Sequence, residues 1–209
     1  MWLEIGVAIV VVFLLFNGIF FMLNWGRQNR EYEFFTKEAA SQLYSKPIDL
    51  KRYTGLWYEV AVLPNSFESN CIGATANYTL NKEGIDVLNT CVRSDGTKTV
   101  ANGVAVLFED AQQYKDRWIK VSFFGSSLPN FYSQLFSGDY LVLHVEDSGT
   151  GPYSQVIVGS IDKKYLWILS RVPNLSQTQL QSLLAIATAK GYDVSQLLIR
   201  NPLVYNNLK

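Results

Sequence analysis

Few side chains in this sequence could carry out chemistry, and the two cysteines and the single histidine are the main candidates. Cys71 and Cys91 could form one disulfide, or one of them could act as a thiolate nucleophile. A zinc site would need a second cysteine pair or more histidines, and His144 stands alone. Nothing in the sequence fixes a serine beside His144, so a Ser-His-Asp set is not indicated. We therefore expect no metal site, no catalytic residues and no cofactor.

The two cysteines flank a predicted hairpin. Cys71 opens one predicted strand and Cys91 ends the next, with a turn near Lys82. A disulfide here would pin the strand ends and contribute about 2–4 kcal/mol by the loop-closure model. Regular hairpin pairing would place Cys71 opposite about Ser94, so a bulge or an irregular strand start must shift the register. We expect a Cys71–Cys91 disulfide, although a reducing compartment would keep both thiols free.

The composition favours one globular domain and disfavours binding to nucleic acid. The 209 residues are 48% hydrophobic, which is enough for one substantial core plus an appendage. Lys plus Arg and Asp plus Glu are equal at 18 each, so no overall field attracts a polyanion. Many of the aromatic residues lie in runs with Val, Ile and Thr, a composition typical of strands.

The amino-terminal run from Ile5 to Leu23 contains no charged residue. As a helix, its roughly 19 residues would span about 28 Å, close to the hydrocarbon thickness of a bilayer. Trp2 and Trp25 flank the run at positions typical of interfacial aromatics. A cleaved secretory signal would need basic residues ahead of the run, and Glu4 is the only charged residue there. We predict an uncleaved transmembrane anchor over residues 1–26.

Residues 27–46 are a predicted stalk, helical or irregular, and the signals for the side of the membrane conflict. Three basic residues follow the apolar run, the last of them Lys37, and this bias favours a cytoplasmic location for the following domain. The two cysteines and the glycosylation sequons that begin at Asn77 and Asn174 suit an oxidising compartment instead. The sequence leaves the side of the membrane open.

From Pro47 onward, short alternating runs bounded by turn residues indicate an antiparallel barrel or sandwich. The predicted strands cover residues 55–63, 72–80, 85–92, 98–109, 115–124, 139–147, 154–161 and 165–171. Eight up-and-down strands are what a small closed barrel needs, and closure removes exposed sheet edges. We predict an all-β domain over residues 47–209, built as an eight-stranded antiparallel up-and-down barrel.

After the last of these strands the hydrophobic period changes. Apolar residues recur at helical spacing from Leu180 to Ala187, after a cap at Asn174 or Ser176 and before Gly191. This pattern predicts one carboxyl-terminal α-helix outside the barrel. The apolar run from Val194 to Ile199 could return as a ninth strand beside the first.

Three segments carry a resemblance to a known family: Tyr53–Val60, Lys120–Gly125 and Tyr165–Arg171. A Gly-x-Trp pattern alone is weak, but the segments occur in order and the predicted helix follows them. Over residues 47–201 the chain resembles the lipocalins, and within them the branch of bacterial outer-membrane lipocalins and apolipoprotein D. A second family motif keeps only its outline, at Thr150–Tyr153. The bacterial members carry a lipid anchor, which this chain would replace with a protein helix.

The resemblance implies that Gly55, Trp57 and Arg171 close one end of the barrel. Trp57 would plug the floor, and Arg171 would lay its guanidinium across the indole, a cation–π contact worth about 0.5–2 kcal/mol. These residues would be structural. The opposite end would be the mouth of a ligand site.

Strand parity predicts the lining of that site. Ile119, Val121 and Phe123 should face inward on one strand, and Trp167 and Leu169 on the last. This apolar, aromatic lining suits an acyl chain or another elongated or flat hydrophobe. The resemblance implies fatty acids or lysophospholipids as the ligand class.

Polar contacts to the head of such a ligand are expected near the mouth. Tyr140 and His144 share a predicted strand face and could meet a carboxylate or phosphate, with His144 the weaker candidate. Glu59 has the inward parity of Trp57, so its carboxylate would need a strand bend or a hydroxyl partner.

Two longer loops, Pro64–Asn70 and Ser126–Gly138, lie at the predicted open end. The second contains several apolar residues, among them Leu128 and Phe136. It could form a lid or a lip that touches the membrane, or fold inward over the core.

We expect a membrane-tethered protein that carries a small hydrophobic molecule and is not an enzyme. One alternative is a lipid-modifying isomerase, because one lipocalin branch uses a free cysteine inside the barrel; neither Cys71 nor Cys91 has a neighbouring basic residue to activate it. Another alternative is a surface interaction module with an unoccupied barrel. The identity of the ligand and the oligomeric state do not follow from the sequence.

Overall fold

The structure, a computed structural model, describes residues 37–82, 84–107, 116–122 and 138–207. The predicted transmembrane run from Ile5 to Leu23, Phe123 and most of the predicted second loop lie outside these residues. Within the described part, no helix combines the length and the apolar character needed to cross a bilayer. The chain divides into two compact units, and the second, from Gln42 to Lys209, contains the fold described below.

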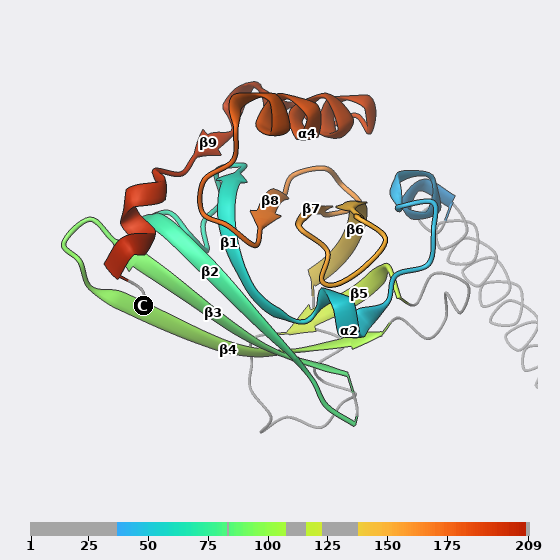
Figure 1. The fold of residues 1–209 in the computed structure, drawn as a ribbon, viewed down its shortest axis with the longest axis horizontal. Coiled ribbons are helices and arrows are strands. Elements are labelled where there is room, and N and C mark those ends of the chain that lie inside the picture. Colours follow the sequence, from blue (N-terminus) through green and yellow to red (C-terminus); the bar gives the residue numbers. More distant parts are fainter. Residues whose placement is uncertain (1–36, 83, 108–115, 123–137, 208–209) are drawn as a thin grey trace, which may run out of the picture. The chain divides into compact units, whose positions relative to one another are not determined.

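The described residues of the second unit form nine antiparallel strands that wind into a barrel (Figure 1). Each strand from β2 to β8 pairs with its neighbours in chain order, and β1 closes the sheet by pairing with both β2 and β8. This order confirms the predicted up-and-down barrel, although the described residues form nine strands rather than the predicted eight because β9 joins β1. The strands are β1 (Gly55–Val62), β2 (Cys71–Leu80), β3 (Ile85–Arg93), β4 (Lys98–Leu107), β5 (Trp118–Ser122), β6 (Gly138–Glu146), β7 (Gln155–Gly159), β8 (Leu166–Ser170) and β9 (Leu198–Ile199).

Strand β1 pairs with β2 along one edge and with β8 along the other. Residues Gly55–Tyr58 pair with β2, while the pairing with β8 runs from Tyr58 to Val62 and contains a register shift between Glu59 and Ala61. Beyond the β2 pairing, β9 pairs with the end of β1. This confirms the predicted ninth strand, which is reduced to two residues because Val194–Gln196 forms the 3-10 helix η2.

The predicted carboxyl-terminal helix is α4 (Gln177–Ala189). Its cap is Ser176, whose hydroxyl accepts from the Gln179 backbone N–H while the Gln179 side chain accepts from the Ser176 backbone N–H. This reciprocal pair satisfies two backbone donors that a helix start leaves free. Gly191 follows the helix with a φ of +86°, a conformation that favours glycine. Helix α4 lies along the outside of the barrel (Figure 1).

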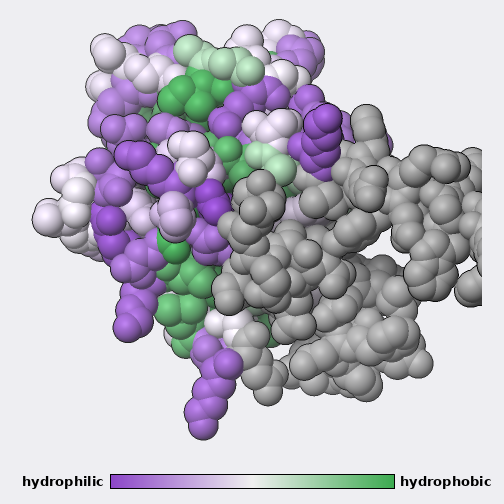
Figure 2. Space-filling model, turned by 90° about the vertical axis from the view of Figure 1, so that its right-hand side faces the viewer, coloured by the Kyte–Doolittle hydropathy of each residue, from purple (hydrophilic) through white to green (hydrophobic). Residues whose placement is uncertain are grey.

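Alternation along the strands divides the apolar side chains between two sides of the sheet. Trp57, Val87 and Leu169 belong to one buried cluster inside the barrel. Ile157 and Ile168 pair with each other on the opposite face of β7 and β8, and both are fully buried. The described surface that Figure 2 shows is mostly hydrophilic, with smaller hydrophobic patches. The interior cluster is therefore the apolar environment in which a site could form.

Candidate functional site

Trp57 and Arg171 build the closed end of the barrel, as the sequence predicted. The short helix α2 (Leu50–Tyr53) precedes β1, and its Tyr53 carbonyl accepts a hydrogen bond of 2.8 Å from the Trp57 indole nitrogen. Trp57 is fully buried, and the guanidinium carbon of Arg171 lies 3.6 Å from the centroid of its ring. The predicted cation–π contact is confirmed.

Arg171 also holds the backbone that leads into β1. Burial lowers its pKa to about 10, so it remains protonated at neutral pH. Gly55 adopts a φ of +99°, and a Cβ there would lie 3.3 Å from the guanidinium, so only glycine suits this position. The guanidinium donates to the carbonyl oxygens of Arg52, Tyr53, Thr54, Leu56 and Tyr153.

The segment Thr150–Tyr153 contacts the residues of the closed end, although it keeps little of the second family motif. The buried Tyr153 hydroxyl accepts from the Asp49 backbone N–H at 3.0 Å. The guanidinium of Arg52 lies 4.3 Å from the Tyr153 ring centroid and pairs with Asp147 at 2.6 Å. These contacts tie the turn after β6 to the floor residues.

The interior lining contains the predicted apolar residues that the structure describes. Ile119 and Leu169 belong to the buried interior cluster, and Val121 and Trp167 pack against it. Val121 and Trp167 also keep some accessible surface, unlike Ile119 and Leu169. The inward direction inferred from strand parity is confirmed for these four residues, while Phe123 lies outside the described part of the chain.

Tyr140 faces the interior, and among the described residues its hydroxyl contacts groups beside the floor rather than groups at the predicted mouth. Its hydroxyl lies 2.7 Å from the Tyr53 hydroxyl and 3.2 Å from the Tyr78 hydroxyl. Tyr53 belongs to the helix that supports Trp57, so this cluster lies next to the floor. Burial raises the pKa of Tyr78 to about 12 and the pKa values of Tyr53 and Tyr140 well above their ordinary value. All three phenols are therefore neutral.

His144 does not share a face with Tyr140, so that prediction is wrong. The β6–β7 register shifts between Val142 and His144, and the bulge moves His144 opposite Ile157, which faces outward. One extra residue reverses the inside and outside positions that follow it. The His144 ring packs edge-on against Tyr44 and its Nε2 lies 3.3 Å from Glu146.

Trp167 lies near the first loop, on the side of the barrel opposite the floor. Its indole nitrogen donates to Glu68 at 3.1 Å, and Glu68 belongs to the predicted loop Pro64–Asn70. Tyr165 stacks on Trp167 with the ring centroids 5.9 Å apart, and the exposed Phe67 packs against Tyr165. The predicted mouth therefore has an aromatic wall with a carboxyl group beside it.

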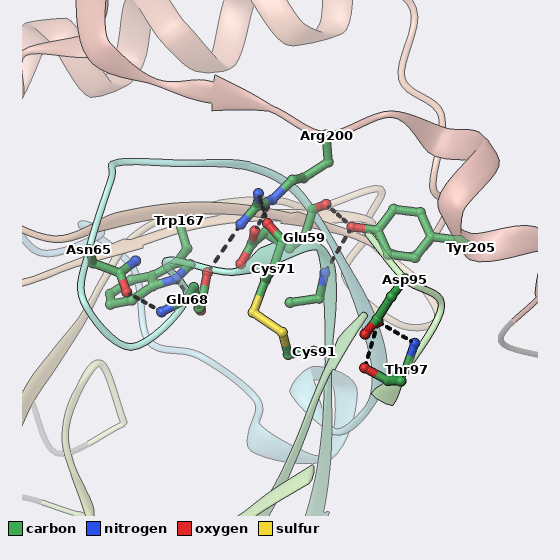
Figure 3. The surroundings of a disulfide bond; sticks show 11 residues. Glu59, Asn65, Glu68, Cys71, Cys91, Asp95, Thr97, Trp167, Arg200 and Tyr205 are labelled. Carbon is green, nitrogen blue, oxygen red and sulfur yellow. Dashed lines mark hydrogen bonds and ion pairs between the residues drawn. A yellow bond between two sulfur atoms is a disulfide. The ribbon is translucent and has the colours of Figure 1, made fainter. Parts of the chain in front are cut away.

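Glu59 is buried, and its partner is a residue that the sequence analysis did not identify. Arg200 donates from Nε to Glu59 at 2.5 Å, and its Nη2 lies 3.4 Å from Glu68 (Figure 3). Burial and the nearby Glu68 raise the pKa of Glu59 to about 8, although Arg200 opposes this shift. The raised pKa favours the protonated form of Glu59 at neutral pH. The required strand bend is present as the register shift after Glu59.

The carboxyl-terminal segment also fills the gap where β1 and β2 separate. Pairing between these strands stops at Tyr58, and beyond it the Tyr205 hydroxyl donates to the Glu59 carbonyl and accepts from the Ala74 backbone N–H (Figure 3). Tyr205 belongs to the 3-10 helix η3 (Pro202–Asn207). In the sequence, the only signal for this arrangement was the inward position expected for Glu59. A buried carboxylate needs a partner, but the pattern did not indicate which residue supplies it.

The predicted disulfide between Cys71 and Cys91 is present, with the two Cα atoms 5.4 Å apart. Cys91 pairs with Ala74 and Cys71 pairs with Arg93, so the two cysteines are not direct cross-strand partners. A register shift between Cys71 and Gly73 brings them close enough to bond. This is the irregular strand start that the spacing required. The isomerase hypothesis loses its nucleophile, because both cysteines of the chain are bonded.

Comparison with known proteins gives consistent matches. A family model described as a lipocalin-like domain matches residues 48–202. Temperature-induced lipocalin-1 of Arabidopsis thaliana is 33% identical over 155 residues, covering 73% of this chain and 78% of that protein. The outer membrane lipoprotein Blc of Escherichia coli (strain K12) is 34% identical over 151 residues, covering 72% and 77%.

Two further matches extend the range of relatives. Apolipoprotein D of Rattus norvegicus is 32% identical over 166 residues, which cover 78% of this chain and 82% of that protein. Among solved structures, insecticyanin from the tobacco hornworm Manduca sexta matches with a TM-score of 0.57 and 22% identity, covering 75% of this chain and 83% of that chain. The structural match supports the fold.

Proposed function

Because this chain belongs to the lipocalin family, we propose that its barrel reversibly binds a small hydrophobic molecule. The observation that carries the proposal is the interior itself, in which Val121, Tyr140 and Trp167 keep accessible surface above the floor that Trp57 and Arg171 close. An apolar lining with few polar groups is typical of sites for hydrophobic ligands. Ile119 and Leu169 complete the proposed contacts. His144 is not among them, because it lies on the outer face.

The finer proposal concerns the ligand class and the location. Relatives of this chain are named as an outer membrane lipoprotein and as an apolipoprotein, which supports a lipid ligand such as a fatty acid or a lysophospholipid. The uncharged run from Ile5 to Leu23 supports a single membrane anchor. The Cys71–Cys91 disulfide favours an oxidising compartment for the barrel. We propose a tethered carrier that takes up and releases lipid at a membrane surface.

A binding titration tests this proposal. A fluorescent fatty acid is added to the full-length protein in lipid nanodiscs, with empty nanodiscs as the blank, and its emission is followed. We expect a saturable signal with a stoichiometry of one. Absence of saturable binding would exclude the carrier hypothesis for this ligand class.

A variant at Trp167 locates the binding in the barrel. Trp167→Ala removes a large aromatic contact from the inner wall, so we expect the affinity for the fluorescent fatty acid to fall about tenfold. The matched control is Val100→Ala, because Val100 is 57% exposed and its loss should not change binding. Equal affinities in Trp167→Ala and Val100→Ala would remove Trp167 from the site.

A further inference from the structure

Three tyrosine hydroxyls meet inside the barrel beside its floor. Tyr53 and Tyr78 each lie within hydrogen-bond distance of Tyr140, at 2.7 Å and 3.2 Å. The rings of Tyr53 and Tyr78 stack with their centroids 5.8 Å apart, and Tyr53 also packs against Trp57 at 5.5 Å. We call Tyr53, Tyr78 and Tyr140 the tyrosine cluster.

A count of hydrogens shows that the tyrosine cluster keeps one donor unused. Each neutral phenol has one hydrogen to donate, so three phenols supply three. The two hydrogen bonds within the cluster consume two of them, whichever hydroxyl acts as donor in each bond. The described residues offer these hydroxyls no other hydrogen-bond acceptor. Leaving a buried donor unpaired costs free energy, so this hydrogen is available to an acceptor that enters the barrel.

The charges around the tyrosine cluster disfavour an anion as that acceptor. Arg171 is the cation beside the floor, but it lies against the Trp57 ring and donates to five backbone carbonyls. Burial raises the pKa of Tyr78 to about 12; Glu68 and Glu59 add to this shift and Arg171 opposes it, so the net effect of the surroundings is to disfavour a negative charge on this phenol. A carboxylate or phosphate at this depth would meet one neutral donor, and the described residues supply no free cation there to compensate for the loss of water.

A second polar atom on the interior face also lacks a partner. The side-chain oxygen of Asn89 is buried, and it makes no hydrogen bond with the described residues. Asn89 pairs with Ala76, which in turn pairs with Trp57, and it has the same strand parity as the interior residue Val87. A ligand oxygen that carries a hydrogen would therefore find an unpaired acceptor on this face as well as the unused phenol hydrogen.

We propose that the tyrosine cluster anchors an uncharged oxygen, such as that of a ketone, an ester or an alcohol, at the inner end of the ligand. This inference rests on the proposed function and narrows its ligand. A bare hydrocarbon end leaves the phenol hydrogen unpaired, and a charged head is kept at the open end of the barrel. The ligand is thus a hydrophobe that enters with a neutral polar group leading.

The test compares three probes of equal chain length: 2-decanone, decane and decanoate. Each is titrated by calorimetry into the full-length protein in nanodiscs, with empty nanodiscs as the blank. The variant Tyr53→Phe/Tyr78→Phe/Tyr140→Phe keeps the ring shapes and removes all three donors. We expect the affinity for 2-decanone to fall about 3- to 10-fold, with the affinities for decane and decanoate unchanged. The matched control is Tyr58→Phe, since Tyr58 packs against Tyr205 outside the cluster and should affect no probe.

A single variant keeps the test decisive if the triple variant does not fold. Tyr140→Phe breaks both hydrogen bonds of the cluster and frees two donors, so we expect 2-decanone to bind as well as before or more tightly. A purely structural cluster predicts that Tyr140→Phe weakens all three probes together. That result, or an unchanged 2-decanone affinity in a folded triple variant, would overturn the inference. If no probe binds to the wild-type protein, the proposed function fails as well, which separates the two outcomes.

Discussion

At the residue scale, the least ordinary feature is a pair of carboxyl groups that share one guanidinium. Glu59 is 2% exposed, and Arg200 contacts both it and Glu68. Burial of a carboxyl favours its neutral form, and a second carboxyl nearby has the same effect. Glu68 also accepts from the indole of Trp167, so the carboxyl group that raises the pKa of Glu59 contacts a residue of the proposed ligand wall.

The raised pKa of Glu59 predicts a stability that depends on pH. In the unfolded chain this carboxyl ionises near 4.5, whereas in the folded protein its pKa is about 8. Between these values the folded state binds more protons than the unfolded state. The contribution of Glu59 to the free energy of unfolding is therefore fully present below about pH 4.5 and is lost as the pH rises toward 8. Each pH unit costs at most about 1.4 kcal/mol within this window. Thermal unfolding of the full-length protein at pH 6, 7 and 8 tests this, and we expect the melting temperature to fall as the pH rises.

The variant Glu68→Gln should flatten this dependence. Glutamine keeps an acceptor for Trp167 but removes the negative charge, so Arg200 can stabilise the ionised form of Glu59 and the pKa of Glu59 falls. Glu146→Gln is the matched control, because the Glu146 side chain is 56% exposed and lies away from Arg200. An equal pH trend in wild type and Glu68→Gln would show that Glu68 does not control the titration.

At the element scale, irregularities in the strands decide what each strand can do. The shift in β1 after Glu59 changes the register of its pairing with β8, and the shift in β2 after Cys71 aligns the cysteines. The shift in β6 after Val142 turns His144 outward. Each bulge adds one residue on one strand and reverses the side on which later residues lie. The disulfide at the end of β2 and the contacts of the carboxyl-terminal segment with β1 both form next to these shifts.

The disulfide is expected to stabilise the β2–β3 hairpin at the end opposite the floor. Cys71 and Cys91 are separated by 20 residues, and opening a loop of this size should lower the free energy of unfolding by about 2–4 kcal/mol. Denaturant unfolding of the full-length protein, followed by tryptophan emission, compares wild type with Cys71→Ser/Cys91→Ser. Reduced wild-type protein should match the variant. Two free thiols on labelling of the denatured, unreduced protein would contradict the bond itself.

At the scale of the whole molecule, the barrel is closed by contributions from both ends of its domain. Helix α2 and Arg171 build the floor, while the segment after β9 covers the seam between β1 and β2 through Arg200 and Tyr205. The interior is left with an apolar wall, the tyrosine cluster near the floor and the carboxyl pair near the first loop. This arrangement places neutral and charged polar groups at different depths.

The proposed tether predicts how the whole protein behaves with membranes. Full-length protein should float with lipid vesicles and resist extraction at alkaline pH, because removing an apolar helix of about 19 residues from a bilayer is very costly. A variant that lacks residues 2–26 should stay in the aqueous fraction. Replacing residues 5–23 with a run of leucines is the matched control and should restore flotation. Flotation of the variant that lacks residues 2–26 would locate the membrane contact elsewhere.

The sequence by itself determined the barrel, its floor and the helix outside it. The barrel and the helix depend on local pattern, which is alternation along strands, turn residues between them and a helical period after them. The floor followed from the family resemblance that Gly55, Trp57 and Arg171 carry. The inward positions of Ile119, Val121, Trp167 and Leu169 followed from the same period.

Only the tertiary structure decided which distant side chains meet. The outward turn of His144, the pairing of Glu59 with Arg200 and the position of Tyr140 beside Tyr53 and Tyr78 required the register of closed strands. A bulge costs little locally, and the sequence pattern does not show where one occurs. A single inserted residue nevertheless exchanges the inward and outward positions of the strand beyond it. Closure of the barrel selects among these registers, because only one of them buries the apolar faces and pairs the buried charges together.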